Sequence, residues 1–191
     1  MKALEDKILK DGIVLNNEIL KVDSSVNHQI DSKLLVEISK DIKNHFNNVD
    51  KIVTIEISGI AFAVGVGIEY GGLPVVFAKK TISRTLDVAN SYVAEVKSFT
   101  KGTLNQIRID KKFLTKGERI LIIDDFLASG NAAIGLIEIL KQAGCEIVGV
   151  SAIIEKRFQG GRKRLEDLGV EVYCPASIDS FADGKPVFHK D

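Results

Sequence analysis

Two adjacent carboxylates, Asp124 and Asp125, follow the short apolar run of residues 120–123. The run is rich in β-branched residues, which predicts a strand buried on both faces, as in a parallel sheet. After the acids come a loop of small side chains and then apolar residues at helical spacing, with a stop at Gly144. This order brings unpaired backbone N–H groups and the positive end of a helix dipole to one place, where an anion can bind.

A ribose 5-phosphate that carries a diphosphate is the ligand that explains this pattern. Adjacent carboxylates can accept hydrogen bonds from vicinal ribose hydroxyls, either directly or through a magnesium ion. The 5-phosphate needs backbone N–H groups from a loop without obstructing side chains. The residues of the candidate loop are Ala128, Ser129, Gly130, Asn131 and Ala132.

Other interpretations of the acidic pair fit the sequence less well. The two acids precede the expected helix by several residues. A role as helix caps therefore explains one acid poorly and a pair of acids even less well. In a phosphoacceptor receiver domain the pair lies on the first strand, and too little chain follows Asp125 for the rest of that fold. A phosphate-binding P-loop needs the motif G-x-x-x-x-G-K-S/T, which is absent, and "GVGIEYG" has the wrong spacing for a dinucleotide fingerprint.

The composition narrows the class of protein. Lysine plus arginine and aspartate plus glutamate number 26 each among 191 residues, so the net charge is zero. A nucleic-acid-binding protein usually has a basic excess, so that class is disfavoured. Charges run through residues 1–12 and no apolar run reaches membrane-spanning length, so we expect a soluble, cytoplasmic protein. Cys145 and Cys174 lack the clustered spacing of a zinc site, and we interpret both as reduced.

Strands and helices alternate along the first half of the chain. Residues 31–46 predict an amphipathic helix that is capped by Asp31 or Ser32. Residues 51–57 predict a strand, a helix of small residues follows from Gly59, and residues 73–80 predict a second strand. Strand, helix and strand in this order form a right-handed parallel crossover unit.

The second half continues the alternation after an irregular segment. Residues 81–106 are polar, with weak alternation over residues 92–98, and a long segment of this kind predicts a functional flap. Beyond the acidic motif we expect a strand over residues 146–156, a short basic helix over 160–169 and a last strand over 170–174. The order predicts one doubly wound α/β domain over residues 1–191, with its ligand beyond the carboxyl ends of the strands.

These motifs resemble those of the type I phosphoribosyltransferases. The signature of that family is a hydrophobic strand, two acids and a small-residue loop that usually contains Thr-Gly-Gly-Thr. Here Ser129 replaces the first Thr, Asn131 the second Gly and Ala132 the last Thr. Fewer hydroxyls would face the phosphate, so backbone donors would carry more of the binding.

The resemblance implies further site residues around the donor, 5-phospho-α-D-ribose 1-diphosphate, and magnesium bound with it. Ser58 and Gly59 resemble the family's diphosphate loop, and Lys79 matches the place where a cationic residue meets the diphosphate. Ser91 and Tyr92 resemble part of the mobile catalytic flap.

Nearly the whole chain resembles the bacterial members of this family that act on xanthine. The match runs through "KIVTIEISGIA", "VVFAKK", "SFTK", "LIIDDFLASGNAA" and "IEKRFQGGR". It implies transfer of the phosphoribosyl group to N9 of xanthine in a homodimer, with diphosphate released. It also implies that Leu20 and Asn27, in an N-terminal hood over residues 1–32, contact the base together with Lys156. A lysine opposite the C2 carbonyl could favour xanthine over hypoxanthine.

Several of these residues also have a purely structural interpretation. Lys156 could be a solvated strand end, and Lys79 with Lys80 could be charges that protect a sheet edge. Phe158 could lie against the purine or belong to the core. Glu56 could be a packing carboxylate or could orient the diphosphate loop.

The reaction expected of this family needs no covalent nucleophile. Exchange at ribose C1 can pass through an oxocarbenium-like transition state that nearby negative charge stabilises. The rival function is a sensor that binds the donor without turnover, as in purine-responsive regulators of this fold. Such regulators add a DNA-binding segment, and residues 1–30 are too short for a helix-turn-helix, so we expect an enzyme.

Overall fold

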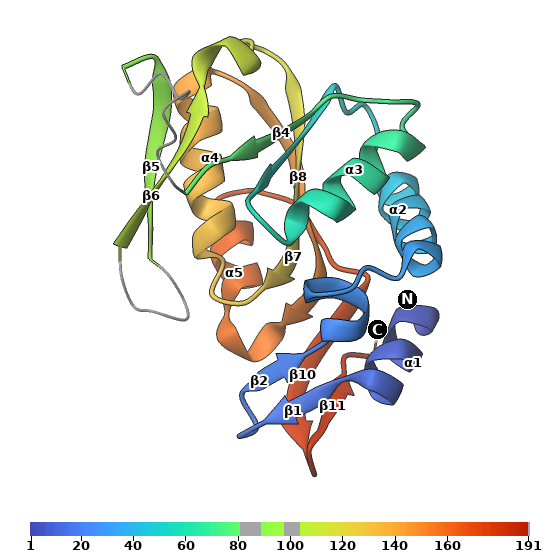
Figure 1. The fold of residues 1–191 in the computed structure, drawn as a ribbon. Coiled ribbons are helices and arrows are strands. Elements are labelled where there is room, and N and C mark those ends of the chain that lie inside the picture. Colours follow the sequence, from blue (N-terminus) through green and yellow to red (C-terminus); the bar gives the residue numbers. More distant parts are fainter. Residues whose placement is uncertain (81–88, 98–103, 191) are drawn as a thin grey trace.

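The computed structural model describes residues 1–80, 89–97 and 104–190. Within these residues, the centre is a seven-stranded, mostly parallel sheet with helices on both faces (Figure 1). Its strands are β3 (Lys51–Ile55), β4 (Val75–Ala78), β7 (Arg119–Leu127), β8 (Glu146–Lys156), β9 (Val172–Tyr173), β10 (Ala176–Ala182) and β11 (Lys185–Phe188). They lie in the order β11-β10-β8-β7-β3-β4, and β9 also pairs with β8. The predicted doubly wound α/β class is confirmed, and its description as one domain stays a prediction.

The helices are α1 (Lys2–Asp11), α2 (Ser32–His45), α3 (Gly59–Glu69), α4 (Asn131–Ala143) and α5 (Gly161–Glu166). The predicted helix at residues 31–46 is α2, and its cap is Asp31, whose side chain accepts from the N–H of Leu34 at 3.2 Å. The predicted stop at Gly144 ends α4 with a φ of 71°. In the described part of the chain, none of the helices is long and apolar enough to cross a membrane. The expected cytoplasmic location stays a prediction.

The central strand β7 is buried on both faces. Ile120 and Ile122 belong to a core shared with α4 and α5, whereas Leu121 and Ile123 belong to a core shared with α1, α2 and α3. Figure 1 shows these two groups of helices on opposite sides of the sheet. A strand that is covered on both faces needs apolar residues at every position, so the continuous apolar run is explained.

The strand that carries the acids is longer than predicted. β7 continues to Leu127 because β8 supplies backbone partners along that whole edge. On the other edge, β3 pairs with β7 only as far as Val53 opposite Ile122. Asp124 and Asp125 therefore lie within the strand rather than after it, on a stretch where the edge facing β3 is open.

The prediction that the last strand lies at residues 170–174 is wrong, because the sheet continues beyond them. Only Val172–Tyr173 form β9, and β10 and β11 follow as an antiparallel hairpin. The hairpin turns at Asp183 and Gly184, whose φ angles are 50° and 71°. An Asp-Gly pair between two short strands is the sequence signal for such a turn.

The segment predicted as a hood lies at the lower end of the molecule in Figure 1. It contains α1, a hairpin of β1 (Ile13–Leu15) and β2 (Ile19–Lys21), and a helical turn, η1 (Asp23–Asn27). Both α1 and β1 contact β11, so the hood rests on the C-terminal hairpin.

The predicted flap over residues 81–106 is described only in part. Residues 81–88 and 98–103, which include the "SFTK" segment, lie outside the described residues. The remainder belongs to β5 (Ser91–Lys97) and β6 (Leu104–Asp110), an antiparallel ribbon that contacts α4. The weak alternation predicted for this region is seen in Ala94 and Val96, which are buried with Ile107 of β6.

Gly135 lets the ribbon approach α4, and we predict that Gly135→Ala destabilises the fold. A Cβ at this position would lie 2.4 Å from Val96 Cγ2 and 3.3 Å from Ile107 Cδ1. Helix propensity alone favours alanine by about 1 kcal/mol, whereas overpacking costs about 1–3 kcal/mol. Urea unfolding should show a net loss of up to about 2 kcal/mol, with faster amide exchange in β5.

The matched control is Lys141→Ala on the exposed side of α4, which should stay within about 0.5 kcal/mol of the wild type. A Gly135→Ala variant that is more stable than the wild type would show that the ribbon shifts freely on α4.

Candidate functional site

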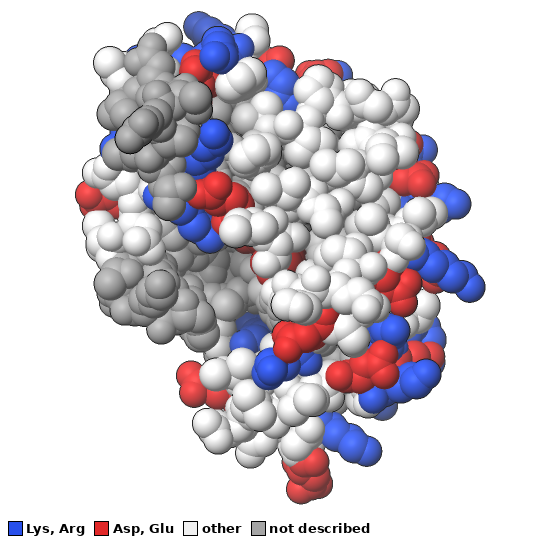
Figure 2. Space-filling view, viewed as in Figure 1, with Lys and Arg blue, Asp and Glu red and all other residues white. Residues whose placement is uncertain are grey.

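A pocket of about 650 Å³ opens at the carboxyl ends of β3, β7 and β8. It exists because β3 stops pairing with β7 before β7 itself ends. Figure 2 shows a hollow in this face of the molecule, with acidic and basic side chains gathered around it. A crevice at this place is where a doubly wound sheet binds its ligand.

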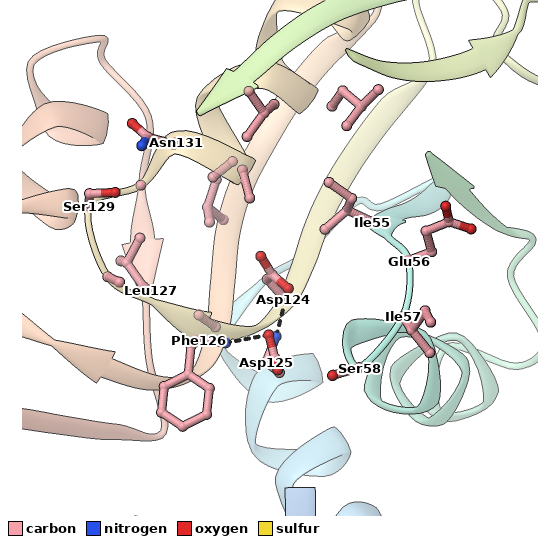
Figure 3. Close-up of a pocket in the computed structure, with 18 of the residues that line it drawn as sticks. Ile55, Glu56, Ile57, Ser58, Asp124, Asp125, Phe126, Leu127, Ser129 and Asn131 are labelled. Carbon is pink, nitrogen blue, oxygen red and sulfur yellow. Dashed lines mark hydrogen bonds between the residues drawn. The ribbon is translucent and has the colours of Figure 1, made fainter. Parts of the chain in front are cut away.

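The acid pair lies at the floor of the pocket. Asp124 is 8% exposed, and its Oδ1 accepts from the N–H of Asp125 at 2.9 Å. Asp125 Oδ1 accepts in turn from the N–H of Phe126 at 2.9 Å (Figure 3). Burial, and then the charge of Asp125, raise the pKa of Asp124 well above its usual range, while Lys80 acts in the opposite direction. A bound cation or hydroxyl donor would relieve this repulsion.

The segment after β3 forms the wall opposite the acids. A Cβ on Gly59 would lie 2.5 Å from Thr54 Oγ1 and 3.1 Å from Asp124 Oδ1, so only glycine allows this close approach. Ser58 lines the pocket beside Asp125 (Figure 3), and the Glu56–Ile57 peptide bond is cis. The structure thus places Ser58 and Gly59 beside the acids, and their role in binding diphosphate stays a prediction.

Of the adjacent pair Lys79 and Lys80, it is Lys80 that reaches the pocket. It lines the pocket, and its backbone N–H donates to Glu56 Oε1 at 2.5 Å. Lys79, the residue expected from the sequence, exchanges two backbone hydrogen bonds with Arg108 at 2.9 and 3.0 Å. It is not among the described lining residues. A role for Lys79 in binding diphosphate stays a prediction.

The small-residue loop forms the far wall, and all five of its residues line the pocket. Gly130 has a φ of 78°, a left-handed conformation that favours glycine, and it immediately precedes α4. The N-terminus of α4 therefore opens beside the pocket, where the positive end of its dipole favours an anion.

The lower wall contains two of the three predicted base contacts, and the third, Asn27, is not among the described lining residues. Leu20 and Lys156 both line the pocket, and Lys156 is 7% exposed. Lys156 Nζ donates to the carbonyl of Glu18 at 3.1 Å, and burial lowers the pKa of its ammonium. Asn27 Nδ2 donates to Asp125 Oδ2 at 3.0 Å, so the hood is hydrogen-bonded to the acid pair.

The aromatic residue of the pocket is Phe126, which the sequence did not single out. Its ring lies 5.8 Å from Lys156 Nζ, and it lines the pocket between the acids and the small-residue loop. Phe158, the aromatic residue considered from the sequence, instead packs edge-on against Phe181 with ring centroids 5.5 Å apart. The one sequence signal for Phe126 is its place directly after the acid pair.

Residues 26–184 match the phosphoribosyl transferase domain family. The chain belongs to this family. A phosphoribosyl transferase from Clostridium perfringens, named xanthine phosphoribosyltransferase 1, is 53% identical over 98% of this chain and 100% of its own length. Xanthine phosphoribosyltransferase 2 from Clostridium botulinum is 50% identical with the same coverage. Xanthine phosphoribosyltransferase from Bacillus cytotoxicus is 48% identical over 98% of this chain and 95% of its own length.

Solved phosphoribosyl transferase structures share the fold at low sequence identity. The adenine phosphoribosyltransferase of Thermoanaerobacter pseudethanolicus is 18% identical, with a TM-score of 0.72 over 90% of this chain and 98% of that protein. The enzyme from Giardia lamblia, complexed with 9-deazaadenine, is 17% identical, with a TM-score of 0.75 over 90% and 95% of the two chains. These structures establish the fold of this phosphoribosyl transferase.

We predict that Asp124→Asn raises the stability of this phosphoribosyl transferase while it lowers activity. Below the ordinary pKa of aspartate, the side chain is protonated in both folded and unfolded chains. As the pH rises, the unfolded chain ionises first, because the pKa of Asp124 is raised in the fold, so the folded state loses stability. Asparagine cannot ionise, so the variant should melt at a higher temperature than the wild type at about pH 8 and the difference should shrink toward about pH 4.

The melting curves are recorded in a chelator without ligand, and activity should fall roughly a hundredfold because the developing cation loses its counter-charge. The matched control is Asp6→Asn, an exposed aspartate paired with Lys2, which should change neither property appreciably. A variant that melts below the wild type at every pH would contradict the assigned charge repulsion.

Proposed function

We propose that the chain is a purine-salvage enzyme that transfers the phosphoribosyl group from 5-phospho-α-D-ribose 1-diphosphate to N9 of xanthine. The products are xanthosine 5'-monophosphate and diphosphate. One observation carries the proposal: a single pocket contains the acid pair, the loop at the start of α4 and the buried Lys156. The support for xanthine is the identity of 48–53% to full-length xanthine phosphoribosyltransferases.

The donor occupies the upper part of the pocket in this proposal. The backbone N–H groups of residues 128–132 bind the 5-phosphate, since no bulky side chain covers them. Asp124 and Asp125 accept hydrogen bonds from the ribose hydroxyls. Ser58, Gly59 and the cationic side chain of Lys80 face the diphosphate, and Lys80 takes the role expected of Lys79.

A magnesium ion bound together with the donor would fit this site. The ligands that Mg²⁺ prefers are oxygens, and the two carboxylates offer them. A cation there would relieve the unfavourable interaction between Asp124 and Asp125. Asp124 and Asp125 would hold the ion together with donor oxygens. When bound, the ion neutralises charge on the leaving diphosphate.

The protein assists the departure of diphosphate through charge and exclusion of water. The negative charge of Asp125, with Asp124, stabilises the cation that develops at ribose C1. The ammonium of Lys80 favours the diphosphate as it takes up charge. Val96 and Ile107 of the ribbon line the same pocket, and their apolar side chains keep out water that would hydrolyse the donor.

The purine lies against the lower wall. Leu20 and Phe126 offer apolar surfaces for the base, and Lys156 donates to its C2 carbonyl. The ammonium then exchanges its contact with the carbonyl of Glu18 for one with the base. Asn27 of the hood acts through Asp125, to which its side-chain amide donates.

The proposal predicts that the protein with magnesium and donor forms nucleotide fastest from xanthine, and that this preference depends on Lys156. In Lys156→Met, the loss of a charge-assisted hydrogen bond should reduce transition-state stabilisation for xanthine by roughly 1.5–3 kcal/mol. This loss corresponds to a fall in kcat/KM of about one to two decades. Hypoxanthine lacks the C2 carbonyl and should lose less. Nucleotide and diphosphate release are measured with xanthine, hypoxanthine and guanine at one donor concentration.

Lys21→Met, at an exposed lysine of the hood, is the control and should keep the wild-type ratios. Equal losses for xanthine and hypoxanthine would remove Lys156 from base selection. No nucleotide formed from any of the three bases would refute the proposed enzyme.

A homodimer is part of the proposal, and the outward face of α3 supports it. Phe62 and Val66 of α3 are buried in the core, yet Val64 and Ile68 on its other side are exposed, Ile68 at 66%. Phe77 of β4, the strand at that end of the sheet order, is exposed as well. An apolar face at the end of a sheet fits a second copy of the chain, paired by two-fold symmetry.

We predict that Ile68→Asp converts the dimer to a monomer, because a charge would be buried at the interface without a partner. Sedimentation velocity at micromolar concentration measures the mass. Leu168→Asp, at another exposed apolar residue beyond α5, should stay dimeric. A monomeric wild type would exclude the dimer.

A further inference from the structure

The loop at residues 128–132 is supported from behind by α5, whose residues are not among the described lining of the pocket. The N–H of Gly161 donates to the carbonyl of Ala128 at 3.0 Å. The backbones are so close that a Cβ on Gly161 would lie 2.3 Å from Ala128 O and 2.8 Å from Gly130 N. Helix and loop are therefore in direct backbone contact, and a shift of α5 would displace the loop.

Arg164 adds a side-chain contact to this support. Its Nη1 donates to the carbonyl of Ser129 and, at 2.8 Å, to Asn131 Oδ1. One nitrogen thus joins the residues on both sides of Gly130. The carbonyl of Ser129 and the N–H of Gly130 belong to one trans peptide, so they point in opposite directions. A carbonyl held by Arg164 therefore fixes the direction of the Gly130 N–H.

This loop depends on backbone direction because few hydroxyls are available to it. Ser129 supplies one hydroxyl, while Asn131 and Ala132 supply none. Backbone N–H groups carry the remaining binding, and a donor contributes fully only when it is aligned with its acceptor.

The other side of α5 is fixed to the end of β8. Arg162 donates to both carboxylate oxygens of Glu155, with Nε at 2.8 and 3.1 Å and Nη2 at 2.7 Å. Glu155 is fully buried and also accepts from Ser177 Oγ at 2.7 Å. It immediately precedes Lys156 in the sequence. The same short helix thus contacts the phosphate loop and the strand end that carries the base-contacting lysine.

We infer that Arg164 is a positioning residue for the 5-phosphate of the donor. Arg164 acts through the Ser129 carbonyl and the Asn131 side chain. The inference rests on the proposed function and concerns how the loop is held. A variant at Arg162 would leave Glu155 buried without its cation and would endanger folding, so the exposed Arg164 is the residue to change.

The experiment separates the two halves of the donor. Ribose 5-phosphate and diphosphate are each measured as competitive inhibitors against 5-phospho-α-D-ribose 1-diphosphate, for the wild type and for Arg164→Ala. The Ki of ribose 5-phosphate and the KM of the donor should both rise roughly tenfold, as expected for misaligned hydrogen bonds to a charged group. The Ki of diphosphate and the KM of xanthine should stay within about twofold, because the described contacts of Arg164 are confined to the loop at residues 128–132.

Three further variants make the result specific. Arg164→Lys keeps a cationic donor on a shorter side chain and should recover part of the loss. Lys163→Ala lies on the same helix and pairs with Asp167, so it should match the wild type. Arg164→Ala combined with Asn131→Ala should cost less than the product of the single effects, because the two side chains act as a unit.

An unchanged Ki for ribose 5-phosphate in a folded Arg164→Ala variant would overturn the inference. So would equal rises in both Ki values, which would indicate a general disturbance of the site. A wild-type protein that does not use the donor would refute the proposed function and this inference with it. An active wild type with an insensitive Arg164→Ala refutes the inference alone.

Discussion

The burial of Asp124 directly beside a second carboxylate, the half-buried Asp125, is the constraint on which the rest of the structure depends. Asp124 and Asp125 repel each other on a buried strand, and such an arrangement costs free energy that the fold must supply elsewhere. The apolar residues of β7 contribute stabilising free energy, because they pack into the cores on both faces of the sheet. The apolar layers on both faces hold the strand in place, and the missing partner on one edge leaves room for a ligand beside the acids.

Much of the fold follows from local pattern, and the errors occur where a distant segment decides the outcome. The positions of α2 and α3 were predicted correctly. The spacing of apolar residues in α2 and the small residues of α3 are local patterns that indicate which faces of each helix are buried. The length of β7 depends on its pairing with β8, which follows α4 in the sequence, and no pattern within residues 120–127 indicates that pairing. The C-terminal hairpin was missed although its Asp-Gly turn is a local signal.

The site was predictable wherever chemistry requires a residue type. An acid pair, a loop without large side chains and a cationic strand end are unusual enough to be recognised, and the structure brings all three to one pocket. The choice between Lys79 and Lys80 depends on which side of an extended chain faces inward, which a sequence with two adjacent lysines does not encode. The choice between Phe126 and Phe158 depends on Phe181, a residue from the hairpin that the sequence did not predict.

The hood rests on β11, and this contact has a consequence for the order of folding during synthesis. Residues 1–27 leave the ribosome first, but the strand against which α1 and β1 pack is made more than a hundred residues later. The sheet around β3, β7 and β8 can assemble earlier, because those strands are already present. A nascent chain therefore contains residues 128–132 well before the hood can dock, and the pocket gains its lining from Leu20 only when the hairpin of β10 and β11 has emerged.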